Sequence, residues 1–353
     1  MKRKVIYLLP ALMLLLASCN GKTTSSLMGA SGSPGEVLLV MDQDWQRDSV
    51  GMAVKDMLQA EVPALPQVEN WLRVLTVDQA DFNDFLRNTR NIFIVDANPN
   101  TYSKNTLKYA YDPWASGQLV VTLQTPSRDS LQMFVKGRGA AIVRDLFLRN
   151  ELFRLANDLL VKDYSSKADS FALSLFKHHI NVPGDIVSYK SADRFLWMSN
   201  NTYDKRLDLA IFALPYNNDK IPPVSQILAL RDSVLGSQIP GSTPESHMTH
   251  NEVVPVEARL VSIPGGETRL EMNGLWEMSG KDMMAGPFVA HAFVDNATHT
   301  LYYVEGFVYN PNELKRDLVR RMQAALYSFR PADRGDFNPE ILKKILWRNI
   351  EIN

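Results

Sequence analysis

Cys19 is the only cysteine in this chain of 353 residues. A protein with one thiol cannot form an internal disulfide, and it also lacks the thiolate clusters of structural zinc sites. Core packing alone must therefore hold the fold together. With 45% hydrophobic and 22% charged residues, the composition is that of an ordinary globular protein. We expect a substantial hydrophobic core, in one large domain or two modest ones.

The segment before Cys19 has the composition of an export signal. Residues 2–4 are basic, and an apolar run follows from 5 to 16. This run is too short to cross a bilayer core of roughly 30 Å as a helix. Residues 16–19 read Leu-Ala-Ser-Cys, which matches the lipobox, where the cysteine thiol receives diacylglycerol after signal cleavage. We therefore interpret 1–18 as a signal peptide and Cys19 as the lipidation site; the alternative is an ordinary signal peptide that happens to contain a cysteine.

Lipidation of Cys19 also predicts where in the cell the protein is located. The two acyl chains of a diacylglycerol anchor a protein stably in a membrane. Residue 20 is Asn rather than Asp, so the inner-membrane retention signal of enteric bacteria is missing. The sequence at 21–24 lacks the acidic cluster that marks surface-exported lipoproteins. We expect a cell-envelope protein held by its lipid on the periplasmic face of the outer membrane.

The charge of the chain argues against nucleic-acid partners. The formal net charge is −1, and removal of the basic residues at 2–4 with the signal peptide lowers it to about −4. Such a surface has no general attraction for nucleic acids or for anionic lipid headgroups. We expect no nucleic-acid partner, and a membrane association that depends on the lipid.

The residues after Cys19 divide into a tether and two halves. Residues 19–35 are the lipidated cysteine and a small, polar, glycine-rich segment, which we expect to be a flexible tether. Residues 36–162 form an N-terminal α/β half, in which continuous apolar runs are typical of buried strands. Its predicted strands are 36–41, 71–77, 91–95 and 119–123, and its predicted helices are 47–60 and 127–162.

Residues 163–353 form a C-terminal α+β half. Between 253 and 309 the apolar period changes to two, which predicts an antiparallel meander with one packed face and one wetter face. Arg269 and Glu271 belong to the wetter face. Further helices are predicted at 166–179, 223–235, 311–328 and 339–348, and further strands at 184–189, 194–198 and 207–214. We predict an α+β fold overall, with mixed and antiparallel sheets flanked by helices.

Two further features bear on the fold. A capping side chain followed by proline is typical of the first turn of a helix. The helix starts predicted in this way are Asn98-Pro99, Thr125-Pro126, Asn310-Pro311 and Asn338-Pro339. The succession of strand, cap, proline and helix in both halves also raises the hypothesis of a duplicated α/β unit, with the meander in its second copy.

Three carboxylates are the first suspects for catalysis. Glu277 and Asp282 flank a loop at 279–286, and Glu305 lies in a neighbouring predicted strand. Two carboxylates on adjacent strands could act as a general acid and base, as they do in glycoside hydrolysis. The alternative is that all three belong to the polar outer face of the sheet.

Aromatic side chains suggest binding instead. Trp276, Tyr302 and Phe307 stand in a meander that is richer in aromatic residues than one face of a small sheet needs. Some of them could form an exposed patch for a glycan or an envelope protein. The alternative for these side chains is ordinary core packing.

Evidence in the sequence for metals and cofactors is weak. His247 and His250 have metal-like spacing, but they follow a stretch rich in proline and glycine that reads as an exposed loop. The chain has no complete phosphate-loop motif and no nucleophile-elbow motif. We expect no cofactor and no metal.

The sequence resembles a family without an established activity. Residues 273–278 (Asn-Gly-Leu-Trp-Glu-Met) and 283–289 (Met-Met-Ala-Gly-Pro-Phe-Val) look like the signature of a Bacteroidota lipoprotein family, the domain of unknown function 4837. The resemblance covers about 36 to 350 and implies no catalytic residues. Its motif is interpreted as structural, because Gly274 beside a large tryptophan permits close strand packing.

These observations favour a membrane-anchored envelope lipoprotein that is a non-catalytic binding or assembly factor. Its partner would be an envelope protein or a glycan. The alternative is a periplasmic hydrolase acting on cell-wall or imported glycan, with the three carboxylates as its catalytic groups.

Overall fold

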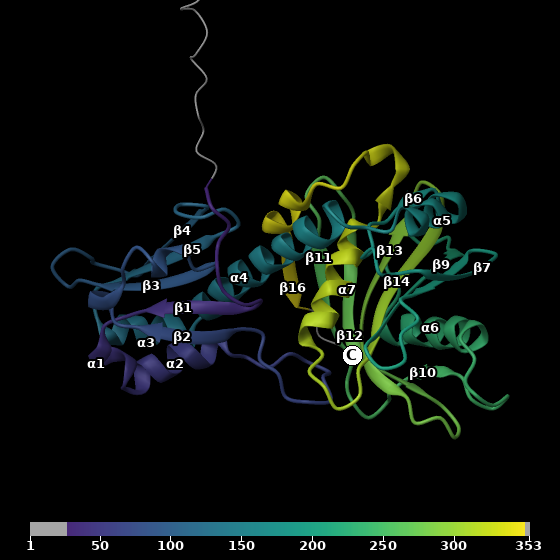
Figure 1. Ribbon diagram of the computed structural model, residues 1–353, viewed down its shortest axis with the longest axis horizontal. Coiled ribbons are helices and arrows are strands. Elements are labelled where there is room, and N and C mark those ends of the chain that lie inside the picture. The colour runs from purple at the N-terminus through teal and green to yellow at the C-terminus, as the bar shows by residue number, and fades with distance from the viewer. Residues whose placement is uncertain (1–26, 350–353) are drawn as a thin grey trace, which may run out of the picture.

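The computed structural model describes residues 27–349 of the chain. The predicted signal peptide and Cys19 lie outside the described residues. Two lobes, each built on a β-sheet, stand side by side and are joined by a long helix (Figure 1). None of the described helices combines the length and the apolar character needed to cross a membrane.

The N-terminal lobe contains a five-stranded sheet in the order β2-β1-β3-β5-β4. Its strands are β1 (Glu36–Val40), β2 (Arg73–Val77), β3 (Asn91–Ala97), β4 (Thr106–Tyr111) and β5 (Leu119–Thr125), with only β4 antiparallel to its neighbour. Its helices are α1 (Gln43–Gln46), α2 (Ser49–Leu58), α3 (Arg128–Lys136) and α4 (Gly139–Leu155). The core cluster of α2, α3 and α4 covers one face. Every residue of β1 is buried, as expected for a strand covered on both faces.

The C-terminal lobe contains a nine-stranded sheet in which every neighbouring pair is antiparallel. Its order is β16-β11-β12-β13-β14-β9-β8-β7, with β10 also on β12. The strands are β7 (Ser188–Ala192), β8 (Phe195–Ser199), β9 (Arg206–Pro215), β10 (Met248–His250), β11 (Glu257–Ser262), β12 (Thr268–Met278), β13 (Ala285–Asp295), β14 (Thr300–Tyr309) and β16 (Leu346–Asn349). A two-stranded ladder joins β6 (His178–His179) to β15 (Arg330–Pro331). The α+β fold is confirmed.

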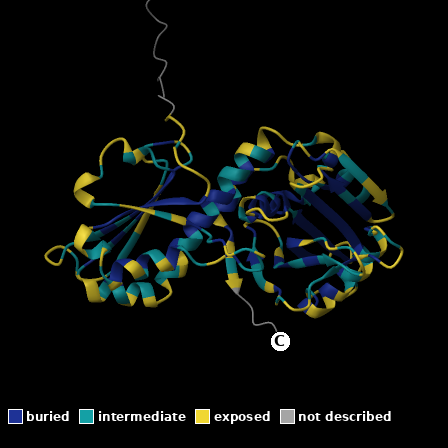
Figure 2. Ribbon diagram, turned by 60° about the horizontal axis from the view of Figure 1, so that its bottom comes forward, coloured by how far each residue is buried: buried dark blue, intermediate teal, exposed yellow. Residues whose placement is uncertain are grey.

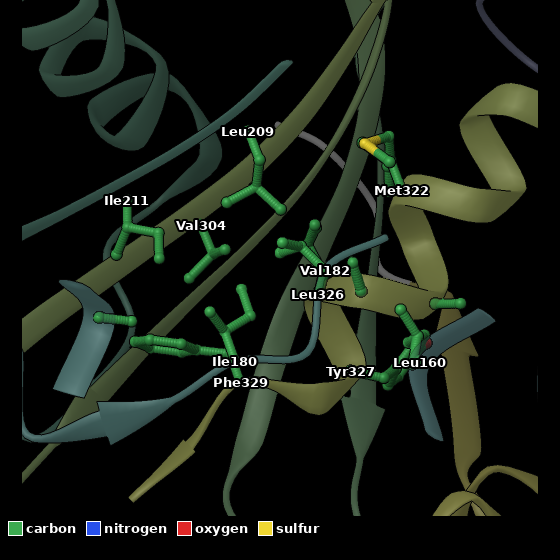
Figure 3. Close-up of a cluster of buried hydrophobic side chains, with 14 of the residues drawn as sticks. Leu160, Ile180, Val182, Leu209, Ile211, Val304, Met322, Leu326, Tyr327 and Phe329 are labelled. Carbon is green, nitrogen blue, oxygen red and sulfur yellow. The ribbon is translucent and has the colours of Figure 1, made fainter. Parts of the chain in front are cut away.

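Helices cover both faces of this larger sheet. On one face lie α5 (Ser166–Phe176) and α7 (Arg316–Ser328), and on the other lies α6 (Val224–Gln238). Figure 3 shows Leu209, Ile211 and Val304 of the sheet together with Met322 and Leu326 of α7, and all five belong to one core cluster. The strands in the middle of the sheet are buried along most of their length (Figure 2), because apolar side chains on both of their faces are covered.

The long helix α4 belongs to both cores. Val143 and Phe147 pack in the N-terminal core, whereas Leu152 packs in the C-terminal core. A π-helical segment, Ala156–Val161, continues α4 and adds its buried side chains to the second core. Trp347 of the last strand packs against both cores as well. The two lobes therefore share α4 and the last strand as structural elements.

Because of these shared elements, we expect the protein to unfold in one cooperative step. Loss of either core removes the packing partners of α4 and exposes apolar surface in the other core. Differential scanning calorimetry of the mature protein should give one transition, with a calorimetric enthalpy close to the van't Hoff enthalpy. Two resolved transitions would contradict this picture and would show that the lobes are energetically separate.

The tether predicted at 19–35 is wrong for its last residues. Ala30 donates its backbone N–H to Ser116 O at 2.9 Å, and Ser31 donates to Asn88 O at 2.8 Å. Arg90 donates in return to Ser31 O. Residues 28–35 are therefore part of the fold, because backbone pairing holds a segment whose composition alone favours disorder.

The cap-and-proline signal identified one helix start of four. Asn338 caps the 3₁₀-helix Pro339–Lys344, as predicted. Asn98 accepts hydrogen bonds from the next backbone N–H groups in a turn without a helix, and Ser127 rather than Thr125 caps α3. Helix α7 begins at Arg316, and the carboxylate of Glu69 accepts the N–H groups of residues 315 and 316 at 2.7 and 3.1 Å. Glu69 belongs to the other lobe, so the sequence next to the helix start contains no residue that would predict this cap.

The hypothesis of a duplicated α/β unit gains no support. The N-terminal sheet is mostly parallel, whereas the C-terminal sheet contains only antiparallel pairs in the described chain. Strand order and connections differ accordingly. The similar successions of strand, cap and proline are local turn chemistry and not a repeated fold.

Candidate functional site

A pocket lies at one end of the C-terminal sheet. Arg206 of β9 is paired with Tyr309 of β14, and Trp276 of β12 is paired with Gly286 of β13. The β8–β9 turn and the β12–β13 hairpin therefore project from the same end of the sheet. The loop that follows α6 closes the third side, because Ile239, Pro240 and Gly241 also line the cavity.

The walls of this cavity are mainly apolar, and its volume is about 160 Å³. We call it the hairpin pocket. Its apolar lining consists of Trp197, Ile239, Pro240, Met248, Trp276, Met278, Met284, Phe307 and Tyr309. Its polar lining consists of Arg206, Asp208, Ser242 and Asp282. Aromatic rings and flexible thioethers around a few polar groups are typical of ligand-binding sites.

Internal hydrogen bonds fix the two tryptophans. The indole N–H of Trp197 donates to Asp208 at 2.9 Å, and that of Trp276 donates to Val308 O at 3.2 Å. Trp276 also packs edge-to-face on Phe307, with ring centroids 5.6 Å apart. Because both N–H groups are satisfied within the protein, the indoles present hydrocarbon to the cavity.

Two glycines permit this packing. A Cβ at Gly274 would lie 2.7 Å from the ring of Phe288, and a Cβ at Gly286 would collide with Val308 O. The close approach of strands beside Trp276 therefore depends on residues without side chains, as predicted for Gly274.

The polar groups stand in two separate arrangements. The guanidinium of Arg206 donates to both carboxylate oxygens of Asp208, at 2.8 and 3.1 Å. Burial raises the pKa of Asp208, and the paired Arg206 opposes that effect. At the rim, Asp282 accepts the Ser242 N–H at 2.7 Å and the Ser246 hydroxyl at 2.5 Å. The hydroxyls of Ser242 and Ser246 hold the pKa of Asp282 below its ordinary value.

The three suspected catalytic carboxylates do not come together. Through the pairing with β13, Glu305 lies opposite Met272 of β12. Met272 and Glu277 are five residues apart in the same strand, so their side chains point to opposite faces. Glu305 and Glu277 therefore lie on opposite faces of the sheet. Glu305 is fully buried and paired with Arg231, and Glu277 accepts the Asn251 amide at 2.6 Å. Asp282 alone reaches the hairpin pocket. The predicted pairing of carboxylates across neighbouring strands is therefore wrong.

The exposed aromatic patch is also wrong as a surface feature. Trp276 and Phe307 are each 3% exposed, and Tyr302 is 6% exposed. Trp276 and Phe307 pack beneath α6, whereas Tyr302 packs in the core on the opposite face. Two of the three residues nevertheless line the hairpin pocket. The aromatic excess arises because both faces of the sheet are covered.

The two histidines with metal-like spacing have separate partners. His250 Nδ1 lies 2.5 Å from Asp232, and His247 Nδ1 lies 2.9 Å from Ser279 Oγ. Among residues 27–349, no cluster of three or more metal-ligating side chains could hold an ion. His250 instead fixes β10 to α6 through Asp232.

The supposedly wetter face of the meander holds a buried polar network. Glu271 is fully buried and accepts hydrogen bonds from His291 at 3.1 Å, Gln323 at 2.8 Å and Tyr327 at 2.8 Å. Arg259 completes this shell and, with the hydrogen bonds, holds the pKa of Glu271 well below its ordinary value against the effect of burial. Since Gln323 and Tyr327 belong to α7, the network joins that helix to the sheet and has a structural role.

Sequence reasoning missed Trp197, Arg206 and Asp208. The sequence feature that could have identified them is the pair Arg206 and Asp208 in a strand that is otherwise apolar. Residues two apart in a strand lie on the same face, so the two opposite charges are neighbours. Such a pair is costly to bury and is typical of a special environment.

Comparison with known proteins identifies domain families rather than an activity. Residues 165–328 match the model of a domain of unknown function (DUF4837), and residues 30–159 match that of another domain of unknown function (DUF8532). The first match covers the second half alone, so the resemblance noted from the sequence extends less far than expected. No curated protein matches the chain.

One solved structure with some similarity is the Ran-binding protein Mog1p from Saccharomyces cerevisiae. The match has 10% identity and a TM-score of 0.30, and it covers 45% of this chain and 92% of Mog1p. A similarity this low carries no argument about function. The family match is more specific, and it includes the strands that form the hairpin pocket. Residues 165–328 of this chain are therefore similar to the DUF4837 family of domains of unknown function.

Proposed function

We propose that this protein is a lipid-anchored binding factor of the cell envelope that holds an apolar side chain of a partner protein in the hairpin pocket. The observation that carries the proposal is the pocket itself, with its walls of aromatic rings and methionines. The N-terminal anchor rests on the lipobox at 16–19.

The size of the pocket supports a ligand no larger than one ring. An apolar cavity of about 150 Å³ can hold benzene, and the hairpin pocket measures about 160 Å³. A phenylalanine or leucine side chain has this size. Met248, Met278 and Met284 can adjust to different shapes, because the unbranched thioether chain has many rotamers. A long acyl chain or an oligosaccharide would not be enclosed.

The position of the pocket supports recognition away from the anchor. In Figure 1 the described chain starts at the top of the N-terminal lobe, whereas β10 and its neighbouring loops lie at the bottom of the other lobe. Residues 20–26 separate Cys19 from the described chain, and so few residues span at most roughly 28 Å. A partner in the periplasm could therefore reach the pocket while the lipid holds the protein close to the membrane.

A hydrolase remains the second proposal, now with different residues. Asp208 and Asp282 line the same pocket, and their pKa values are shifted in opposite directions. Carboxyls in contrasting environments are a feature of acid–base catalysis. Against this proposal, Arg206 already occupies both oxygens of Asp208. Hydrolysis of cell-wall fragments by the wild type, lost in both Asp208→Asn and Asp282→Asn, would establish the enzyme and displace the binding factor.

The binding proposal is tested by cross-linking and affinity purification of the full-length lipidated protein from native membranes. Met284→Trp fills the pocket, and Phe85→Ala alters an exposed side chain of the N-terminal lobe as a matched control. We expect a stoichiometric envelope protein with the wild type and the control, and at least a tenfold loss with Met284→Trp. Equal recovery with all three proteins would contradict the proposal.

The anchor has its own test. Cys19→Ala should abolish labelling by fatty acid and release the protein from the membrane fraction, because two acyl chains provide the stable attachment. A variant that is processed and fractionates like the wild type would overturn the anchor while leaving the pocket untouched.

A further inference from the structure

The charges around the hairpin pocket do not cancel. Arg206 and Asp208 neutralise each other on one wall through two hydrogen bonds. On the opposite wall, the carboxylate of Asp282 receives only neutral donors among the described residues, namely the Ser242 N–H and the hydroxyls of Ser242 and Ser246. The adjacent Lys281 is exposed, and the described groups that act on the Asp282 carboxylate are Ser242 and Ser246 rather than Lys281. The rim therefore carries one fixed negative charge.

The surroundings fix the position of this carboxylate. A Cβ at Gly241 would collide with both Ser246 Oγ and the Asp282 carboxylate, so Gly241 leaves the space that the acid occupies. Ser246 is 3% exposed, and its Oγ lies 2.5 Å from Asp282 Oδ2 and 2.8 Å from Ser279 O, so these two acceptors share its single hydroxyl proton. Asp282 is thus held by the loop after α6 and by the β12–β13 hairpin at once. A carboxylate held in one place costs less entropy when it binds a cation.

Exposed side chains at two hairpin tips extend the surface beyond the cavity. Tyr203 in the β8–β9 turn and Met283 in the β12–β13 hairpin are each 96% exposed. Met283 stands between Asp282 and Met284, which line the pocket, and Tyr203 belongs to the turn that leads to Arg206, which also lines it. Together with Asp282, they form a rim that can contact the residues flanking a bound side chain.

We propose that the partner presents an extended segment in which an aromatic or large aliphatic side chain is flanked by lysine or arginine. This inference rests on the proposed function and specifies its ligand. The apolar side chain enters the hairpin pocket, and the neighbouring cation pairs with Asp282. Charge complementarity decides between cationic and anionic segments, since the only uncompensated charge on the described pocket lining is negative.

Three short peptides test the inference on the full mature protein. Acetyl-Lys-Phe-Lys-amide carries both features, acetyl-Glu-Phe-Glu-amide reverses the charge, and acetyl-Lys-Ala-Lys-amide removes the ring. Binding is followed by the indole ¹H–¹⁵N NMR signals of Trp197 and Trp276, assigned with single Trp→Phe variants. We expect saturable shifts with the first peptide, at least fivefold weaker binding of the second, and no shift with the third.

A matched pair of variants isolates the carboxylate. Asp282→Asn keeps the shape and removes the charge, and Asp56→Asn removes an exposed charge from α2 in the other lobe. Asp282→Asn should weaken binding of the first peptide about three- to fivefold, the size expected for one rim ion pair. It should leave the affinity for the second peptide equal or higher, and Asp56→Asn should change neither.

The outcomes separate the two proposals. If the first two peptides bind equally, or if Asp282→Asn binds the first peptide like the wild type, the cationic segment is excluded and the pocket remains a site for apolar groups. If neither phenylalanine peptide shifts the indole signals at millimolar concentration, the pocket does not bind such side chains and the proposed function itself is overturned.

Discussion

Replacement of Arg231 by methionine is expected to lower the free energy of unfolding by about 3–5 kcal/mol, the cost of removing one partner of a buried ion pair. Arg231 lies in α6 and donates to both carboxylate oxygens of Glu305, at 2.8 and 2.7 Å. Both side chains are fully buried, and the guanidinium also lies over the ring of Phe288. Without the cation, a carboxylate remains in the core, and the Tyr303 hydroxyl is its one remaining donor among residues 27–349. Urea denaturation followed by circular dichroism measures the loss.

The double variant Arg231→Met/Glu305→Gln is the decisive control. Glutamine keeps the shape of Glu305 and can still accept the Tyr303 hydroxyl, so the double variant should be more stable than Arg231→Met alone. Arg321→Met breaks the exposed pair with Asp185 and should cost less than about 1 kcal/mol. If Arg231→Met were as stable as Arg321→Met, the ion pair between α6 and the sheet would not be as described.

Trp276→Ala is expected to destabilise the protein by about 3–5 kcal/mol, as for other large aromatic residues removed from a core. Trp276 is 3% exposed, packs on Phe307 and donates its indole N–H to Val308 O. Alanine leaves an enlarged cavity and an unpaired carbonyl. Thermal or urea unfolding measures the effect.

The control for this variant is Tyr203→Ala, at a residue that is 96% exposed. It should change the free energy of unfolding by less than about 0.5 kcal/mol. An unchanged melting temperature in Trp276→Ala would place that indole at the surface and would remove one wall of the hairpin pocket.

Strands with continuous apolar runs could be predicted from sequence, and so could the meander, from its alternation of apolar and polar residues. β1, β3 and β5 were identified because both of their faces are covered, and successive residues of these strands are therefore apolar. β4 (Thr106–Tyr111) was missed, since it is an edge strand with a largely exposed and polar sequence. The final strand β16 was taken for helix, because the 3₁₀ turn Pro339–Lys344 before it has helical composition.

Burial of the second sheet face could not be predicted from alternation. Arg269 and Glu271 alternate with apolar residues, and that pattern predicts a solvated face. Helix α7 covers this face, and its Gln323 and Tyr327 supply the hydrogen bonds that make burial of Glu271 tolerable. Those partners are more than fifty residues away in the chain, so only the folded structure brings them together.

The candidate site was predictable only in part. Trp276, Phe307 and Asp282 were singled out from the aromatic meander and its loop, and all three line the hairpin pocket. The exposed patch and the carboxylate pair were not found, whereas the alternative of core packing describes Trp276 and Phe307. Trp197 and the pair Arg206–Asp208 reach the same cavity only through the register of β8, β9 and β14, which the sequence does not reveal.

The central claim, that the hairpin pocket holds a partner, is tested most directly by photo-cross-linking from its rim. A photoreactive phenylalanine analogue replaces Met283 at the rim or Met133 on α3, which are both exposed, and the full-length protein is irradiated in native membranes. We predict one discrete adduct from position 283, lost when Met284→Trp fills the pocket, and no such adduct from position 133. No adduct from position 283, or one that is unaffected by Met284→Trp, would contradict the claim.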